Sequence, residues 1–281
     1  MSQLASHAAE RRTVRTPSGP VAVLDTGPGR LTPALLVPGF TGSKEDFAPL
    51  LDRLAATGRR TVAIDLPGQY ESPGPDDPAA YGMDVLAADV AAVIADLRAR
   101  PHLVGHSFGG LVGRALVLAT PSTVSSYVLL DSGPAAAVGE RRARLEALEP
   151  VLDSGGLPAV YAAIEAAESS DPRWQATPVD LRDFLKRRFL ASSAAGLKGM
   201  ADALRREPDR VDELAAAGVP LLVACGVEDN AWSPAVQEEM AHRLGAGFVA
   251  IPGAQHSPAV ENPDETARIL LDFWSTVDEH D

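Results

Sequence analysis

The sequence contains one cysteine, few aromatic residues and no long apolar run. A single cysteine, Cys225, excludes an intramolecular disulfide, and its place in the apolar run 221–226 predicts a buried strand residue. No run approaches the roughly 20 apolar residues of a membrane-spanning helix, so the sequence predicts a soluble protein without membrane insertion. The first twelve residues lack the apolar segment of a secretory signal, which favours the cytoplasm.

Basic residues are also scarce, with 25 Lys and Arg against 38 Asp and Glu and a formal net charge of -13. Such a surface repels phosphate backbones and anionic lipids, which argues against nucleic acid or an anionic membrane as a partner. No metal-ligand spacing is present, so no metal or organic cofactor is expected. A chain of 281 residues, 46% of them hydrophobic, suffices for one large α/β domain. The composition leaves the oligomeric state open.

The pattern Gly-x-Ser-x-Gly at 105–109 stands between an apolar run and a run of helical character. This predicts a strand, a sharp turn and a helix, with Ser107 at the apex and its hydroxyl above the carboxyl edge of a sheet. A Cβ at either flanking glycine would crowd the strand or the helix. His106 adjoins the serine but points another way around the turn, so it is predicted to pack against the pocket.

Apolar runs alternate with helical patterns from about residue 34 onward, after a predicted hairpin over 12–25. The expected strands cover 34–37, 61–64, 102–105, 127–130, 221–224 and 248–251, and helices are expected over 45–58, 85–98 and 263–277. The alternation predicts an α/β fold with a mostly parallel sheet flanked by helices. Ligands of such sheets bind beyond the carboxyl ends of the strands.

The alternation breaks between residues 133 and 218, where the sequence is helix-prone and carries no clear strand. We expect a helical cap or lid over 133–218, inserted into a core formed by 12–132 and 219–279. The charge clusters at 140–142 and 186–188 are expected to be solvated helix faces.

A serine hydroxyl needs a base to become a nucleophile, and histidine is the most suitable one at neutral pH. The candidate is His256, in the loop that follows the last predicted strand, at the sheet edge where Ser107 lies. The base in turn needs a carboxylate that orients it. Asp229, after the penultimate strand, is the first candidate, while Asp131 and Glu228 remain alternatives.

An oxyanion formed on the substrate needs two hydrogen-bond donors. The backbone N–H groups of Phe108 and Phe40 are the candidates, because one follows the serine and the other lies in the glycine-rich loop after strand 34–37. Gly39 and Thr41 in that loop allow close approach of the backbone to a substrate. Trp232 is expected to complete the pocket wall, although plain core packing of these aromatic rings is an equal alternative.

Together these residues resemble the α/β-hydrolase family over 13–277, with the family order Ser107, Asp229, His256. The stretches 38–40 and 65–72 are similar to the family's oxyanion loop and its Asp-x-x-Gly-x-Gly-x-Ser loop. Three positions depart from the family pattern without removing a catalytic group: Pro38 replaces a histidine, Gln69 and Tyr70 replace the second-glycine region, and Gln255 stands where glycine is common.

The residues and the resemblance favour a serine hydrolase that cleaves a carboxylic ester of a small acyl substrate through an acyl-enzyme. The same triad is compatible with a thioester, a lactone, an amide or a C–C bond alpha to a ketone, because bond choice depends on the pocket. A non-catalytic receptor for a small ligand is a further alternative on the same fold.

Overall fold

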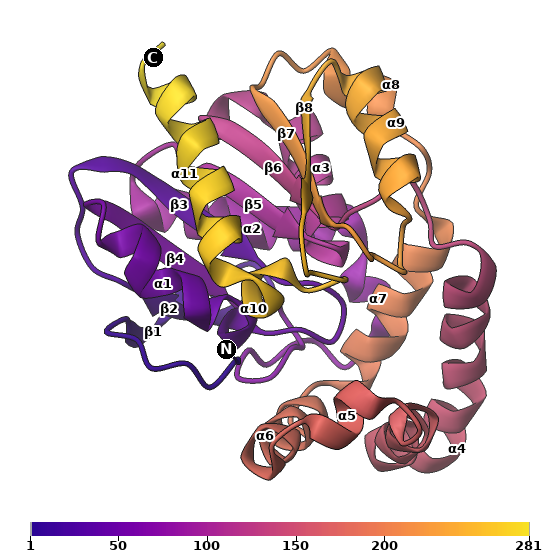
Figure 1. The fold of residues 1–281 in the computed structure, drawn as a ribbon. Helices are drawn as coiled ribbons and strands as arrows, with labels where there is room; N and C mark the ends of the chain where they lie inside the picture. Colours follow the sequence, from indigo (N-terminus) through magenta and orange to yellow (C-terminus); the bar gives the residue numbers. More distant parts are fainter. Residues whose placement is uncertain (1, 281) are drawn as a thin grey trace.

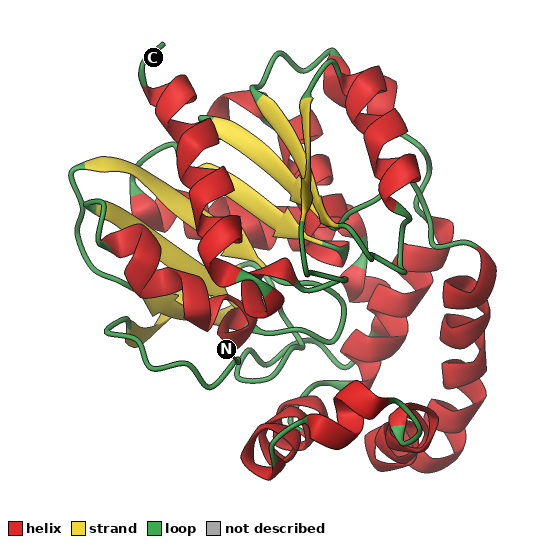
Figure 2. Cartoon of the chain, in the orientation of Figure 1, coloured by secondary structure: helices red, strands yellow, loops and turns green. Residues whose placement is uncertain are grey.

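A twisted eight-stranded sheet with helices on both faces forms the centre of the computed structural model, which describes residues 2–280 (Figures 1 and 2). The strands lie in the order β1-β2-β4-β3-β5-β6-β7-β8. They are β1 (Glu10–Thr16), β2 (Gly19–Asp25), β3 (Leu31–Val37), β4 (Arg59–Ile64), β5 (His102–His106), β6 (Ser126–Leu130), β7 (Leu221–Gly226) and β8 (Gly247–Ile251). The α/β class predicted from the sequence is confirmed.

β1 and β2 form the predicted hairpin and pair antiparallel. β2 also pairs antiparallel with β4. From β4 to β8 every pairing is parallel. Parallel strands present their carboxyl ends at one edge, so the loops after β3, β5, β6, β7 and β8 meet there. This edge carries every candidate site residue in the core.

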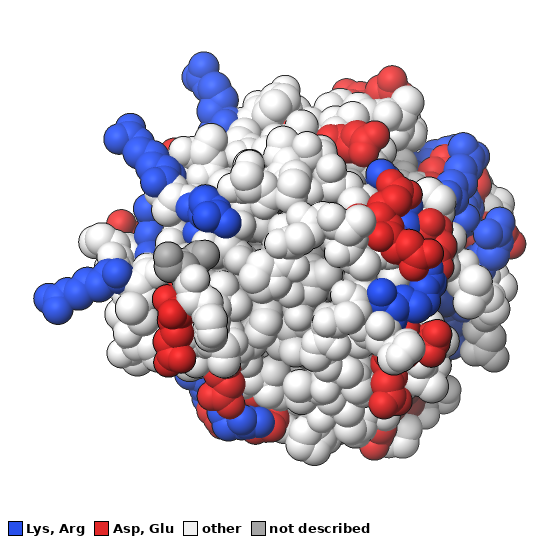
Figure 3. Space-filling model, turned by 90° about the horizontal axis from the view of Figure 1, so that it is seen from above, with Lys and Arg blue, Asp and Glu red and all other residues white. Residues whose placement is uncertain are grey.

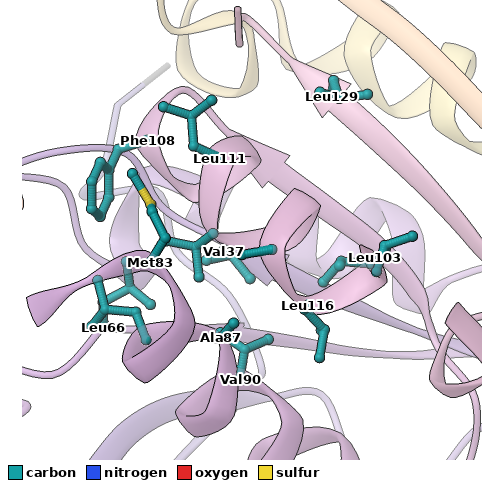
Figure 4. Close-up of a cluster of buried hydrophobic side chains, with 14 of the residues drawn as sticks. Val37, Leu66, Met83, Ala87, Val90, Leu103, Phe108, Leu111, Leu116 and Leu129 are labelled. Atoms are coloured by element: carbon teal, nitrogen blue, oxygen red, sulfur yellow. The ribbon is translucent and has the colours of Figure 1, made fainter. Parts of the chain in front are cut away.

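Strand alternation divides the core into two layers. Leu35 and Val37 of β3 face one apolar cluster, and Ala34 and Leu36 face the other. The first cluster is covered by α2 (Met83–Leu97), α3 (Phe108–Ala119), α8 (Val211–Ala215) and α9 (Pro234–Leu244), and the second by α1 (Ala48–Ala55), α10 (Pro258–Glu261) and α11 (Pro263–Asp278). Figure 4 shows part of the first cluster, where Phe108 and Leu111 lie near Val37 and Met83.

The helix expected over 45–58 is shorter than predicted. A 3-10 turn, η1 (Lys44–Phe47), comes first, and α1 follows it and ends at Ala55. Asp46 caps this turn by accepting a hydrogen bond from the Ser43 N–H at 3.0 Å. The local capping at Ser43 thus replaces the first helical turn that periodicity suggested.

The strand-free region contains α4 (Gly139–Glu168), α5 (Pro172–Ala176), α6 (Val179–Leu190) and α7 (Ala194–Arg206), with α8 at its end. Gly156 interrupts α4 with φ 65°, a conformation that suits glycine. Figure 1 shows α4, α5 and α6 projecting beyond the sheet edge, whereas α7 runs back to the core, where Met200 and Leu204 are buried. Leu214 of α8 belongs to the same core cluster, so this helix packs with the sheet layers.

The face turned away from α4, α5 and α6 is broad and mostly uncharged, with acidic and basic side chains around its margins (Figure 3). Within residues 2–280, no helix combines the length and the apolar character needed to cross a bilayer.

Candidate active site

The turn between β5 and α3 holds Ser107 in strained backbone, with φ 54° and ψ -116°. Its N–H donates to Leu130 O at 2.9 Å, and its carbonyl accepts from Ser132 Oγ at 2.8 Å. A Cβ on Gly105 would lie 2.5 Å from Gly109 O, and one on Gly109 would lie 2.5 Å from the carbonyls of residues 37 and 38. The tight turn therefore requires glycine at both positions, as the sequence pattern predicted.

Three side chains from three loops form one hydrogen-bonded chain. Ser107 Oγ lies 2.9 Å from His256 Nε2, and His256 Nδ1 lies 2.9 Å from Asp229 Oδ1. Asp229 also accepts from the Ala231 N–H at 2.8 Å and from Gln237 Nε2 at 2.7 Å. Burial opposes ionisation of this carboxyl, yet the hydrogen bond and charge of His256 hold the pKa of Asp229 below its usual range.

His106 secures the loop that carries His256. Its Nε2 lies 2.6 Å from the His256 carbonyl oxygen, so this nitrogen donates and carries the proton. Burial, and then the neighbouring His256, lower the pKa of His106 to about 4, and the ring stays neutral at physiological pH. The residue predicted as a packing neighbour therefore also makes a polar contact to the His256 backbone.

The two alternative carboxylates have different surroundings. Glu228 is exposed and pairs with Arg173 at 3.2 Å. Asp131 is fully buried at the end of β6, where Oδ1 accepts from the Gly226 N–H at 2.9 Å. Its Oδ2 finds no donor in the described part of the chain. Burial and the adjacent charge of Asp229 raise the pKa of Asp131 to about 9, which favours the un-ionised acid at neutral pH.

Asp131→Asn is expected to raise stability above neutral pH. The native pKa of about 9 exceeds the ordinary 3.8, so the native state holds one extra proton between these values. The free energy of unfolding therefore falls as pH rises through this window, by up to about 1.4 kcal/mol per pH unit from this group. The asparagine has no titrating proton and keeps an oxygen that accepts from the Gly226 N–H, so this contribution to the pH dependence disappears.

The measurement is urea unfolding of the wild type and of Asp131→Asn at pH 5, 6, 7 and 8. Glu228→Gln, which removes an exposed carboxylate, is the matched control and should follow the wild type. Equal pH slopes for the wild type and Asp131→Asn would contradict a protonated Asp131.

The two expected oxyanion donors lie at the sheet edge beside Ser107. Phe108 is the first residue of α3, where a helix leaves its backbone N–H groups free. A Cβ on Gly39 would lie 3.1 Å from Ser107 Cβ, so the loop that carries Phe40 is in close contact with the serine. The Phe40 and Phe108 rings pack with centroids 6.5 Å apart.

Gln69 fixes the orientation of the Phe40 peptide. Gln69 Nε2 donates to Gly39 O at 2.8 Å, and Gln69 Oε1 accepts from the Leu66 N–H at 3.1 Å. The Gly42 N–H also donates to Gly39 O, at 3.0 Å. In a trans peptide the carbonyl and the following N–H point in opposite directions. Anchoring Gly39 O therefore aims the Phe40 N–H away from Gln69. The sequence marked this position only as a departure from the family pattern.

Gln69→Ala is expected to lower kcat by about 10- to 100-fold, because loosening the Phe40 peptide weakens one oxyanion donor without deleting it. KM for a small neutral ester should change less than kcat. Gln69→Glu is a matched variant, since it retains the side-chain length but cannot donate to Gly39 O. Full activity in both variants would show that the peptide is held without this amide.

The space between Phe40 and the helical insertion is narrow and lined mainly by apolar side chains. Two cavities beside Phe40 each hold only about 10 Å³, roughly one water molecule. The first is lined by Thr41, Leu157, Phe189, Leu197 and Met200, among others. Trp232 is buried, with its ring centroid 6.4 Å from that of His256. Of the other predicted pocket residues, Thr41 borders the first cavity, Gly39 lies against Ser107 and the His106 ring lies beside that of His256.

Arg141, from the first turn of α4, was not expected at the site. Its Nη2 donates to Ser107 Oγ at 3.2 Å, its Nη1 lies 3.3 Å from His256 Nε2, and its Cζ stands 4.8 Å from the Trp232 ring centroid. The prediction of a solvated face is wrong for this residue. It is also wrong for Arg188, which is largely buried and pairs with Asp46 at 2.6 Å. A cluster of charged residues in the sequence does not show which of their side chains points toward the protein interior.

One group of potential metal ligands occurs among the described residues: Asp131, Asp229 and His256, with donor atoms within 4.8 Å of one another. These atoms already bond to one another or to neighbouring amides. An un-ionised Asp131 is also a poor ligand, because metals bind the carboxylate. The donor set fits a hydrogen-bonded carboxyl pair better than a cation.

An eight-stranded, mostly parallel sheet with a serine at a strained turn and a histidine at the same edge defines an α/β-hydrolase. Residues 34–269 match the alpha/beta hydrolase family, and the chain belongs to this family.

Relatives within the family differ in chemistry. The chain is 26% identical over 270 residues to "Putative 2-succinyl-6-hydroxy-2,4-cyclohexadiene-1-carboxylate synthase" of Bacillus subtilis (strain 168), covering 91% of this chain and 95% of that protein. It is 30% identical over 256 residues to "Putative carbamate hydrolase RutD" of Variovorax paradoxus (strain S110), covering 89% and 94%. Among solved structures, a carboxylesterase of Nitrososphaera gargenis matches with a TM-score of 0.80 and 21% identity, over 96% of this chain and 100% of that one.

Proposed function

We propose that this protein is a serine hydrolase that cleaves small carboxylic esters through an acyl-enzyme. The chain of hydrogen bonds from Ser107 through His256 to Asp229, with 2.9 Å at each link, is the observation that carries the proposal. A nucleophile, a base and an orienting carboxylate within hydrogen-bond reach are what acyl transfer requires. Membership of a hydrolase family supports the same class of reaction.

In the proposed acylation, Ser107 Oγ attacks the ester carbonyl while its proton passes to His256 Nε2. Asp229 accepts the Nδ1 proton in a hydrogen bond and stabilises the imidazolium that forms. The N–H groups of Phe40 and Phe108 donate to the oxyanion. When the tetrahedral intermediate collapses, the carbon–oxygen bond to the alcohol breaks and His256 returns the proton to the departing oxygen.

In the proposed deacylation, His256 takes a proton from water as the water oxygen attacks the acyl carbon bound to Ser107. The same two N–H groups hold the second oxyanion. The bond to Ser107 Oγ then breaks, the carboxylic acid leaves and the proton returns to the serine. All groups in both half-reactions come from the chain itself and the substrate.

The helical insertion over 133–218 is proposed to act as a lid, with α4, α5 and α6 as its projecting part. The cavities beneath it hold only about 10 Å³ each, which is too little for an ester. Substrate entry therefore requires α4 to move away from Ser107, and closure afterwards excludes bulk water from the reaction.

The proposal is tested by labelling with a fluorophosphonate, which reacts with activated serines. Digestion and mass analysis should place the phosphonyl group on the peptide that contains Ser107. Hydrolysis of p-nitrophenyl acetate and p-nitrophenyl butyrate should be lost in parallel with labelling. Labelling on another serine, with ester turnover unaffected, would refute the assignment.

A carbamate is the second candidate bond, favoured by the 30% identical relative whose name gives that activity. The same attack on a carbonyl carbon applies, with an amine as the leaving group. A panel of matched ester, thioester, lactone, amide and carbamate substrates, compared by kcat/KM, separates these chemistries.

A further inference from the structure

From its contacts, we infer that Arg141 forms an anion-binding subsite over Ser107, so that the preferred substrate is an ester that carries a carboxylate a few bonds from the scissile carbonyl. The inference rests on the proposed function and specifies its substrate class. It accounts for a charged side chain of the helical insertion that the reaction itself does not use.

Among the residues whose side chains the structure describes, no carboxylate forms an ion pair with the guanidinium of Arg141. Its polar contacts are with Ser107 Oγ and His256 Nε2, neither of which is an anion. Asp229 acts on it through space, but that carboxylate is already engaged by His256. Other arginines of the chain, such as Arg205 and Arg243, form ion pairs with carboxylates at the surface. A largely enclosed guanidinium without an anion is costly unless a ligand supplies one.

The surroundings of Arg141 also favour the binding of an anion. Burial, with the nearby charge of Arg144, lowers the pKa of Arg141, whereas carboxylate partners raise the pKa of Arg205 and Arg210. The guanidinium of Arg141 lies over the Trp232 ring, with Cζ 4.8 Å from the ring centroid, in a cation–π contact. A planar guanidinium is suited to bind a carboxylate through two parallel N–H···O bonds.

A small polar cavity lies beside this guanidinium. It measures about 130 Å³ and is lined by Arg141, Arg144, Asn230 and Ala231. Arg144 is one helical turn beyond Arg141, so both side chains share a face of α4. Two guanidinium groups at one opening attract an anion even though the chain as a whole carries a net charge of -13.

The position of Arg141 limits how far the carboxylate of the substrate can lie from Ser107. A charged N–H···O bond is about 2.8 Å long, so a carboxylate oxygen held by Arg141 lies within about 6 Å of Ser107 Oγ. A succinate or glutarate half-ester satisfies this limit.

The test compares mono-(4-nitrophenyl) succinate with its neutral methyl ester, methyl 4-nitrophenyl succinate, on the wild type, Arg141→Gln and Arg144→Gln. We expect the wild type to prefer the anionic substrate in kcat/KM by about 10-fold or more, the size of effect of one charge-assisted hydrogen bond. Arg141→Gln should lose this preference, measured as the ratio of kcat/KM for the anionic ester to kcat/KM for the neutral ester. Arg144→Gln, at the outer end of the cavity, should lose less of it.

A binding measurement does not depend on turnover. Succinate should raise the Tm of the wild type and not that of Arg141→Gln, and succinamide should raise neither. No preference for the anionic ester, an equal loss of both activities in Arg141→Gln, or no selective response to succinate would each overturn the inference. If Ser107→Ala kept full ester turnover while succinate still bound through Arg141, the proposed catalytic role would fail and the anion site would stand.

Discussion

Ser107→Ala is expected to lower kcat for p-nitrophenyl acetate by at least about 10⁴-fold, with little change in stability. The substitution deletes the attacking oxygen, and residual turnover then comes only from the oxyanion donors and from binding. The strained backbone at φ 54° is imposed by the flanking glycines and by hydrogen bonds to residues 130 and 132, none of which needs the hydroxyl.

Steady-state kinetics, fluorophosphonate labelling and a thermal melt of the same preparations check this expectation. Ser154→Ala is the matched control, because its hydroxyl is exposed and bonds only to its own helix. Turnover in Ser107→Ala within 10-fold of the wild type would exclude a serine nucleophile at this turn.

Asp229→Asn is expected to lower kcat by about 10³- to 10⁴-fold, with KM nearly unchanged. The asparagine cannot stabilise the imidazolium of His256, and its amide can hold the ring in the wrong tautomer. If the NH2 group of the asparagine takes the other oxygen position instead, it opposes Gln237 Nε2 at 2.7 Å, because two amide N–H groups then face each other.

Asp131→Asn is the matched comparison, because it changes the other buried carboxyl of the same cluster. It is expected to keep kcat within about 10-fold of the wild type, since no hydrogen bond joins Asp131 to His256. The pH profiles of kcat/KM for both variants complete the experiment. An inactive Asp131→Asn beside a nearly fully active Asp229→Asn would transfer the orienting role to Asp131.

The pairing of two neighbouring strands explains why the sequence did not decide between Asp131 and Asp229 as the carboxylate that orients His256. Asp131 follows β6 and Asp229 follows a loop after β7, and these strands pair directly in the sheet. Both positions reach the edge where His256 lies. Only side-chain packing separates them, because one carboxyl meets the imidazole and the other turns toward the Gly226 N–H.

Local pattern alone predicted the strands of the sheet and the strained serine turn. Apolar alternation and glycine spacing are governed by backbone sterics and burial, which act within a few residues. These features can therefore be recognised from the sequence.

The tertiary structure alone decided which members of the polar clusters enter the site. Successive residues of a helix point about 100° apart, so Arg141 turns toward Ser107 while Arg142 pairs with Glu146 at 2.9 Å outside. Gln69 likewise acquires its contact with Gly39 O only when two distant loops meet. Such contacts depend on the placement of whole elements, which no local sequence rule encodes.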